Sequence, residues 1–198
     1  MRLFDEIRND NSELWTTIVD SDKLKLKYHR VEGQSAHTFY GEKIIQAPMI
    51  NFKSVLLEFQ LYKHWLPNCY DSAVLSQVSE FRKLTYCLNK CPWPWKNRFF
   101  ICNATGMQIP NKKAFLVMME TVPSDKWLNG YQIKRDDSLV ESTVETITLT
   151  LEMLDANTVK MSQIICIDSH ILLPDWLINT FTKKVLQQWL EQVELRAV

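Results

Sequence analysis

The sequence is short of glycine and has no excess of charge of either sign. It contains only four glycines among 198 residues, against seven tryptophans and nine phenylalanines. Lysine plus arginine equals aspartate plus glutamate at 23 each, so no net electrostatic field attracts a highly charged partner. The composition therefore disfavours nucleic-acid binding and indicates one domain with a large, aromatic-rich interior.

Long apolar runs are also missing. No apolar stretch of the sequence approaches the roughly 18 residues that a membrane-spanning helix requires. The first six residues, Met1 to Glu6, already carry charges, which argues against the apolar core of a signal peptide there. We therefore expect a soluble, cytoplasmic protein, with a single domain covering residues 1–198.

The cysteines give no sign of a disulfide framework or a metal site. They number five and have no Cys-x-x-Cys spacing, which predicts free thiols in a reducing compartment. Cys87 and Cys91 lie four residues apart, but no paired histidines lie nearby, so free thiols are favoured over a zinc site. We expect no metal and no other cofactor.

Motifs of the common enzyme classes are absent from the sequence. There is no Gly-x-Ser-x-Gly, P-loop, Gly-x-Gly-x-x-Gly or His-Glu-x-x-His pattern. Asp168, Ser169 and His170 contain the letters of a catalytic triad, but adjacent residues on an extended strand point to opposite faces. We therefore predict no catalytic residues.

The sequence does contain a regular succession of helical and strand patterns. Apolar residues at helical spacing predict helices over residues 1–20, 50–65 and 173–194, and Pro174 suits the first turn of the last one. Alternation between turn signals predicts strands over 24–31, 37–47, 73–79, 82–90, 98–105, 114–122, 130–136, 142–154 and 158–168. The first two strands form a plausible hairpin. A meander with a helix packed on one face belongs to the α+β class.

The stretch Cys91-Pro92-Trp93-Pro94-Trp95-Lys96-Asn97-Arg98-Phe99-Phe100-Ile101 is the most distinctive of the chain. Its two prolines fix φ and remove backbone donors, which predicts an extended corner that delivers a strand into a sheet. With Trp15 in the first helix, Trp65 ending the second, and the closing residues 167–193, this stretch resembles the START family of lipid-transfer domains, named after the steroidogenic acute regulatory protein. The resemblance covers about residues 10–195 and depends on the joint order of these motifs.

The resemblance implies a helix-grip fold, in which a curved antiparallel sheet wraps around a long C-terminal helix. It also implies an internal cavity for one lipid, gated by that helix and adjacent loops. Arg98 matches the family's arginine, but Phe99 stands where an acid usually follows, and Ala104 stands where many members carry a second, cavity-facing arginine. Because a desolvated phosphate needs charge-assisted donors, an apolar wall here favours a sterol or another weakly polar lipid over a phospholipid.

Strand alternation and the expected gate give a set of candidate lipid-binding residues. They are Tyr86, Phe100, Cys102, Ala104, Met118, Leu149 and Leu151 in the strands, and Leu177, Thr180 and Phe181 in the last helix. The alternative is that these side chains fill a solid core. A transient peripheral membrane contact is expected at Trp127 and Leu128, which follow Lys126, unless Trp127 packs under its own loop.

We expect a lipid-binding or lipid-transfer domain and not an enzyme; the sequence names no protein partner. Two alternatives stay open. An enzyme of the wider helix-grip superfamily, such as a cyclase or a hydrolase, needs a polar cavity with acid–base groups, for which Glu145, Gln163 and Tyr86 are candidates. A scaffold that keeps the fold with a filled pocket needs no cavity at all.

Overall fold

The computed structural model of the protein describes residues 14–30, 35–123, 126–130, 138–171 and 175–198, with the backbone alone at residues 110, 175–183 and 186. Its strands are β1 (Thr16–Asp20), β2 (Leu24–His29), β3 (Ala36–Ile45), β4 (Cys69–Ser79), β5 (Arg82–Asn89), β6 (Arg98–Ile109), β7 (Ala114–Glu120), β8 (Val140–Glu141), β9 (Thr143–Asp155) and β10 (Thr158–Asp168). The α-helices are α2 (Met49–Leu57) and α3 (Asp175–Ala197), and the 3-10 helices are η1 (Phe59–His64), η2 (Pro110–Lys112) and η4 (Leu128–Gly130).

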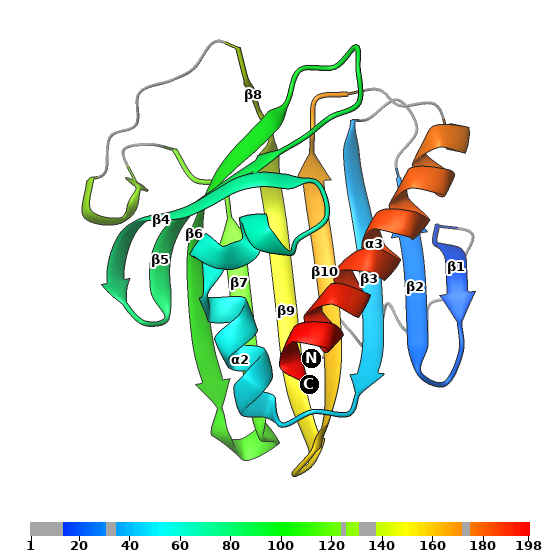
Figure 1. The fold of residues 1–198 in the computed structure, drawn as a ribbon, viewed down its shortest axis with the longest axis vertical. Helices are drawn as coiled ribbons and strands as arrows, with labels where there is room; N and C mark the ends of the chain where they lie inside the picture. The colour runs from blue at the N-terminus through cyan, green and yellow to red at the C-terminus, as the bar shows by residue number, and fades with distance from the viewer. Residues whose placement is uncertain (1–13, 31–34, 124–125, 131–137, 172–174) are drawn as a thin grey trace.

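The strands form one curved sheet in the order β1-β2-β3-β10-β9-β7-β6-β5-β4. Neighbours along this path are antiparallel, and the short β8 adds to β6 in parallel. The predicted hairpin between the first two long strands is confirmed as β2 and β3. Figure 1 shows α3 running diagonally across the concave face of the sheet, with α2 beside it. The α+β class and the helix-grip arrangement are thus those predicted.

The main core lies where the concave face meets the C-terminal half of α3. Alternate residues of β7, β9 and β10 point into it, and Phe115, Leu151 and Met161 are at most 1% exposed. Leu190 and Val193 of α3 pack on the same cluster. Full burial of a large apolar side chain is worth about 1.5–3 kcal/mol, so these contacts fix the helix on the sheet.

Polar contacts hold the same end of α3. The Lys43 ammonium lies 2.6 Å from the Glu194 carboxylate, and the Asn51 amide of α2 donates to the Ala197 carbonyl at 2.8 Å. The second bond satisfies one of the carbonyls that a helix leaves free at its C-terminus. The two helices are therefore joined to each other as well as to the sheet.

The convex face of the sheet is covered by two smaller apolar clusters. Trp15 packs over Tyr40 and Ile164. On the same face, over β5 and β6, Trp127 and Leu128 pack on a cluster of strand residues that contains Leu84, Leu88, Phe99 and Ile101. Alternate residues of β5 and β6 therefore serve the two faces of the sheet.

Two of the predicted elements need correction, and a third cannot be compared over most of its length. The helix predicted over residues 1–20 is wrong where it is described, since residues 16–20 form β1; the four β-branched residues 16–19 favour a strand. The second helix does not continue to Trp65, because α2 ends at Leu57 and η1 follows. The strand predicted over 130–136 falls almost entirely outside the described residues, and Gly130 belongs to η4.

Candidate functional site

A cavity of about 230 Å³ lies between the concave face of the sheet and the layer formed by α2, η1 and α3. Strands β5, β6, β7, β9 and β10 form one wall of the cavity. Its lining is mostly apolar and includes Phe59, Leu66, Phe100, Val117, Met119, Ile147, Ile165, Val185 and Trp189. Exposed Glu80 and Phe81 also line it, so the cavity reaches the protein surface beside the turn between β4 and β5.

The register of the sheet shows where the cavity ends. Val117, Leu149 and Gln163 are partners across β7, β9 and β10, and all three line the cavity. Two residues further along these strands, Phe115, Leu151 and Met161 form the next paired row and belong to the solid core. The row that contains Gln163 is therefore the base of the cavity.

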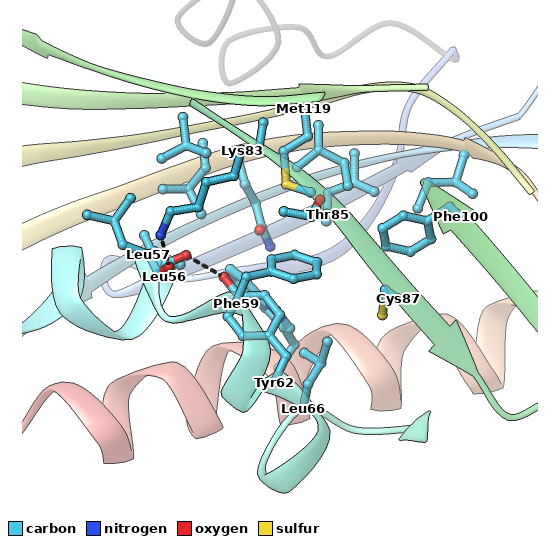
Figure 2. A pocket seen from close by; sticks show the side chains of 18 of the residues that line it. Leu56, Leu57, Phe59, Tyr62, Leu66, Lys83, Thr85, Cys87, Phe100 and Met119 are labelled. Atoms are coloured by element: carbon cyan, nitrogen blue, oxygen red, sulfur yellow. Dashed lines mark hydrogen bonds between the residues drawn. The ribbon is translucent and has the colours of Figure 1, made fainter. Parts of the chain in front are cut away.

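The break between α2 and η1 gives the cavity its second wall. Figure 2 shows Leu56, Leu57, Phe59 and Tyr62 facing the strand residues across the cavity. The Tyr62 hydroxyl donates to the Leu56 carbonyl at 3.0 Å, and the Lys83 ammonium donates to the Leu57 carbonyl at 2.8 Å. Both carbonyls belong to the C-terminal end of α2, where helical partners are lacking. These two bonds therefore stabilise a helix that ends at Leu57 and does not continue to Trp65.

The ionisable groups of this wall are poorly suited to acid–base chemistry. Burial raises the pKa of the Tyr62 hydroxyl well above its usual range. The hydrogen bond shared with the neighbouring Cys69, together with burial, raises the pKa of the Cys87 thiol. Both groups therefore remain neutral at pH 7, and the described lining contains no carboxylate–histidine or carboxylate–carboxylate pair.

Three predicted lipid-binding residues, Phe100, Ala104 and Leu149, line the cavity. Leu151 lies on the same face but is fully buried in the solid core beyond the base. Cys102 is fully buried on the cavity side of β6 and is not a lining residue; burial raises the pKa of its thiol to about 12. The predicted residues of β6 and β9 thus lie on the concave face, as alternation indicated, but Cys102 and Leu151 are not part of the cavity lining.

Tyr86 and Met118 do not line the cavity. Tyr86 packs in the cluster on the convex face, against Phe99, with ring centroids 5.9 Å apart. Met118 is 45% exposed, whereas its neighbours Val117 and Met119 line the cavity. Both corrections have one physical reason: side chains alternate along a strand, so an error of one residue moves a side chain to the other face.

The candidates in the last helix lie outside the described side chains. Leu177, Thr180 and Phe181 belong to α3, for which side chains are described from Lys184 onward, apart from Leu186. The α3 residues that are described at the cavity are Val185 and Trp189.

The two predicted membrane-contact residues have packing roles of their own. Trp127 and Leu128 both contact the apolar cluster on the convex face. The Trp127 indole donates to the Val122 carbonyl at 3.1 Å, as a partly buried indole N–H requires. The most exposed tryptophan described is Trp93, at 92%.

Sequence reasoning missed the wall formed by η1 and the two neighbouring thiols beside it. Phe59 and Tyr62 face the cavity because η1 begins a new direction after Leu57. Cys69 and Cys87 lie 18 residues apart in the sequence, yet their sulfur atoms are 3.6 Å apart across β4 and β5. The hydrogen bond with Cys87 lowers the pKa of Cys69. Long-range pairing of this kind leaves no signal in local spacing.

The acid–base cluster considered for an enzyme is not assembled. Glu145 is exposed and accepts a hydrogen bond from the Cys166 thiol at 3.0 Å, and Tyr86 lies on the convex face. Of the three candidates, only Gln163 lines the cavity. The open cavity also distinguishes this chain from a scaffold with a filled pocket.

A curved antiparallel sheet, a C-terminal helix across it and an apolar cavity between them define a helix-grip protein. Human STARD10 has this fold, with a TM-score of 0.78, 15% identity, and coverage of 99% of this chain and 77% of that one. A STAR-related lipid transfer protein fragment from Xanthomonas axonopodis gives 0.71, 23% identity, and coverage of 93% and 99%. Human StAR-related lipid transfer protein 5 gives 0.77, 10% identity, and coverage of 99% and 91%.

These likenesses confirm, at the level of the fold, the resemblance to the START family. No protein-family model matches the sequence, and no curated protein does either. Within the described part of the chain, neither helix combines the length and the hydrophobicity needed to cross a membrane.

Proposed function

We propose that the protein binds a single lipid in this cavity and carries it between membranes. The cavity is the observation that supports the proposal, because apolar side chains from strands, α2, η1 and α3 line it together. A lipid chain leaving a bilayer loses about 0.8 kcal/mol for each CH₂ exposed to water, or about 13 kcal/mol for 16 carbons. An apolar cavity lowers this cost. Two of the compared structures are named as lipid transfer proteins, which supports the same function.

The proposed ligand is weakly polar, such as a sterol. Ala104 lines the cavity without charge, and Lys83, the cation among the described lining residues, already donates to the Leu57 carbonyl. Lys83 alone among the described lining residues supplies charge-assisted donors, which is fewer than the desolvation of a phosphate group requires. The volume of about 230 Å³ is below the ~300–1,000 Å³ typical of ligand pockets, which also favours a compact ligand.

The identity of the ligand is tested by loading the protein from vesicles that contain both sterol and phosphatidylcholine. After re-isolation of the protein, the bound lipid is extracted and measured by mass spectrometry. We expect one sterol per chain. Phospholipid as the sole extracted lipid contradicts the proposed ligand class, and an empty protein contradicts lipid binding itself.

We further propose that the loop between β5 and β6 makes the transient membrane contact. Trp93, at its tip, is 92% exposed, and Lys90 and Lys96 on either side are exposed as well. Tryptophan suits the headgroup region of a bilayer, and lysine reaches anionic headgroups from there. The packing of Trp127 and Leu128 on the convex face makes them weaker candidates for this contact.

We also propose that the protein works in a reducing compartment such as the cytoplasm. All five cysteines are free thiols, including the neighbouring pair Cys69 and Cys87. Thiols this close persist where the surroundings are reducing.

A further inference from the structure

The base of the cavity carries a polar side chain, Gln163, that has no hydrogen-bond partner among the described residues. Gln163 is 1% exposed and lines the cavity, yet neither its amide nitrogen nor its amide oxygen has a hydrogen-bond partner in the described part of the chain. A buried amide without partners costs free energy. A group of this kind is expected where a ligand completes the hydrogen bonds.

Three other polar side chains of the cavity lining are already engaged. Thr85 donates to the Cys102 carbonyl at 3.2 Å, Tyr62 to the Leu56 carbonyl, and Lys83 to the Leu57 carbonyl. They are therefore less available to a ligand. Gln163 alone among these four offers both a donor and an acceptor that are unused.

The opposite strand leaves room for the Gln163 side chain. Gly41 of β3 is its register partner, and a Cβ at position 41 lies only 3.0 Å from the Gln163 amide nitrogen and 3.3 Å from its Cγ. A larger residue at this position displaces the amide. The position of the Gln163 amide therefore depends on the absence of a side chain at position 41.

We propose that Gln163 selects the ligand, which is a lipid with an uncharged group that both donates and accepts a hydrogen bond. Alcohols and amides have this chemistry, whereas hydrocarbons, ethers and esters lack the donor. The ligand binds with this group against Gln163 at the base of the cavity and with its apolar part above it, along the lining of Val117, Met119 and Ile165. This inference rests on the proposed lipid-binding function and names the ligand class of the same site.

Matched pairs of lipids test the proposal. Cholesterol and its methyl ether, and hexadecanol and its methyl ether, are each presented to the purified protein in phosphatidylcholine vesicles, and bound lipid is measured by native mass spectrometry. Each ether keeps the apolar skeleton and removes the donor. We expect the wild type to bind each alcohol about tenfold more tightly than its ether, as the loss of one buried hydrogen bond predicts. N-methylpalmitamide and methyl palmitate form a further pair, in which the amide offers a donor and an acceptor and the ester offers acceptors only. This pair shows whether an amide is bound as well as an alcohol.

Two variants connect the preference with Gln163. Gln163→Leu is expected to bind alcohol and ether equally and to melt at the same or a higher temperature, since it removes a buried polar group without a partner. Gly41→Ala is expected to weaken the preference for the donor while keeping every polar group. Thr150→Val is the matched control. The Thr150 hydroxyl is also buried without a partner among the described residues, but it lies on the opposite side of β9 from Leu149, so its removal is expected to leave the preference unchanged.

The outcomes separate this proposal from the function on which it rests. If the wild type binds none of the lipids, the proposed function fails and Gln163 selects nothing. If the wild type binds lipid without preferring donor-bearing members in either series, or if Gln163→Leu keeps the preference, the assignment of Gln163 is overturned while lipid binding stands. A large loss of stability in Gln163→Leu also overturns it, because that result indicates a structural role.

Discussion

His37 of β3 is a buried histidine with one side-chain partner. It is 6% exposed, and its Nδ1 lies 2.9 Å from the Tyr28 hydroxyl, while its Nε2 has no partner in the described structure. Burial, and after it the charge of Arg30, lower the pKa of His37, against the smaller opposing effect of Asp168. The folded protein therefore keeps this imidazole neutral to a lower pH than the unfolded chain does.

This difference predicts how stability depends on pH. Below about pH 6.5 the unfolded chain takes up a proton at His37 that the folded protein does not, so the free energy of unfolding falls as the pH is lowered from 7.5 to 5. Urea titrations of the wild type and His37→Gln across this range measure the effect. The variant is expected to show a shallower dependence. Equal slopes for the two proteins contradict the lowered pKa.

Single residues also explain why the site could be predicted only in part. Alternation from Arg98 correctly places Phe100 and Ala104 on the cavity side, and it places Phe99 on the other side, in the cluster under Trp127. Of the two departures from the family pattern, Ala104 therefore bears on the polarity of the cavity, and Phe99 does not. Arg98 is buried and donates to the Ser169 and Lys96 carbonyls, so it joins strand ends instead of facing a ligand.

At the scale of elements, long alternating segments could be predicted and interrupted helices could not. The strands over 82–90, 142–154 and 158–168 were predicted to within about one residue, because alternation and turn residues agree there. The break after Leu57 depends on donors from Tyr62 and Lys83, and Lys83 is 26 residues away. Such tertiary contacts leave no trace in helical periodicity.

The attachment of α3 gives a prediction at this scale. Leu190 is 1% exposed in the main core, whereas Leu195 on the same helix is 66% exposed. Leu190→Ala is expected to lower the free energy of unfolding by about 2–5 kcal/mol, measured by urea denaturation. The matched control Leu195→Ala is expected to change it by less than about 0.5 kcal/mol. Similar losses in the two variants contradict the attachment described here.

At the scale of the whole molecule, the proposed function has two parts: the cavity holds the lipid, and the exposed loop between β5 and β6 contacts the membrane. Figure 1 shows this loop projecting from one end of the sheet. Asn89, the last residue of β5, lines the cavity, and the loop that carries Trp93 begins directly after it. A loop in the bilayer interface therefore brings the Asn89 end of the cavity close to the membrane, which is the end opposite to the β4–β5 turn where the cavity reaches the surface.

Membrane contact through this loop predicts a selective effect of Trp93→Ala. Co-sedimentation with anionic vesicles is expected to weaken roughly tenfold, while the melting temperature stays unchanged because the side chain is 92% exposed. Ile50→Ala, on α2, removes an apolar side chain that is 65% exposed elsewhere and serves as the control. Unchanged vesicle binding by Trp93→Ala, or an equal loss in Ile50→Ala, argues against this contact.

The most direct test of lipid carriage is the transfer of a fluorescent sterol between donor and acceptor vesicles by a variant with a filled cavity. Ala104→Phe places a large side chain in the cavity, and Met107→Phe adds the same side chain at a position of β6 that is 45% exposed and outside the lining. We predict that Ala104→Phe reduces the transfer rate at least tenfold without loss of stability and that Met107→Phe transfers like the wild type. Wild-type transfer by a folded Ala104→Phe variant, or no transfer by the wild type, contradicts the proposal that this cavity carries a lipid.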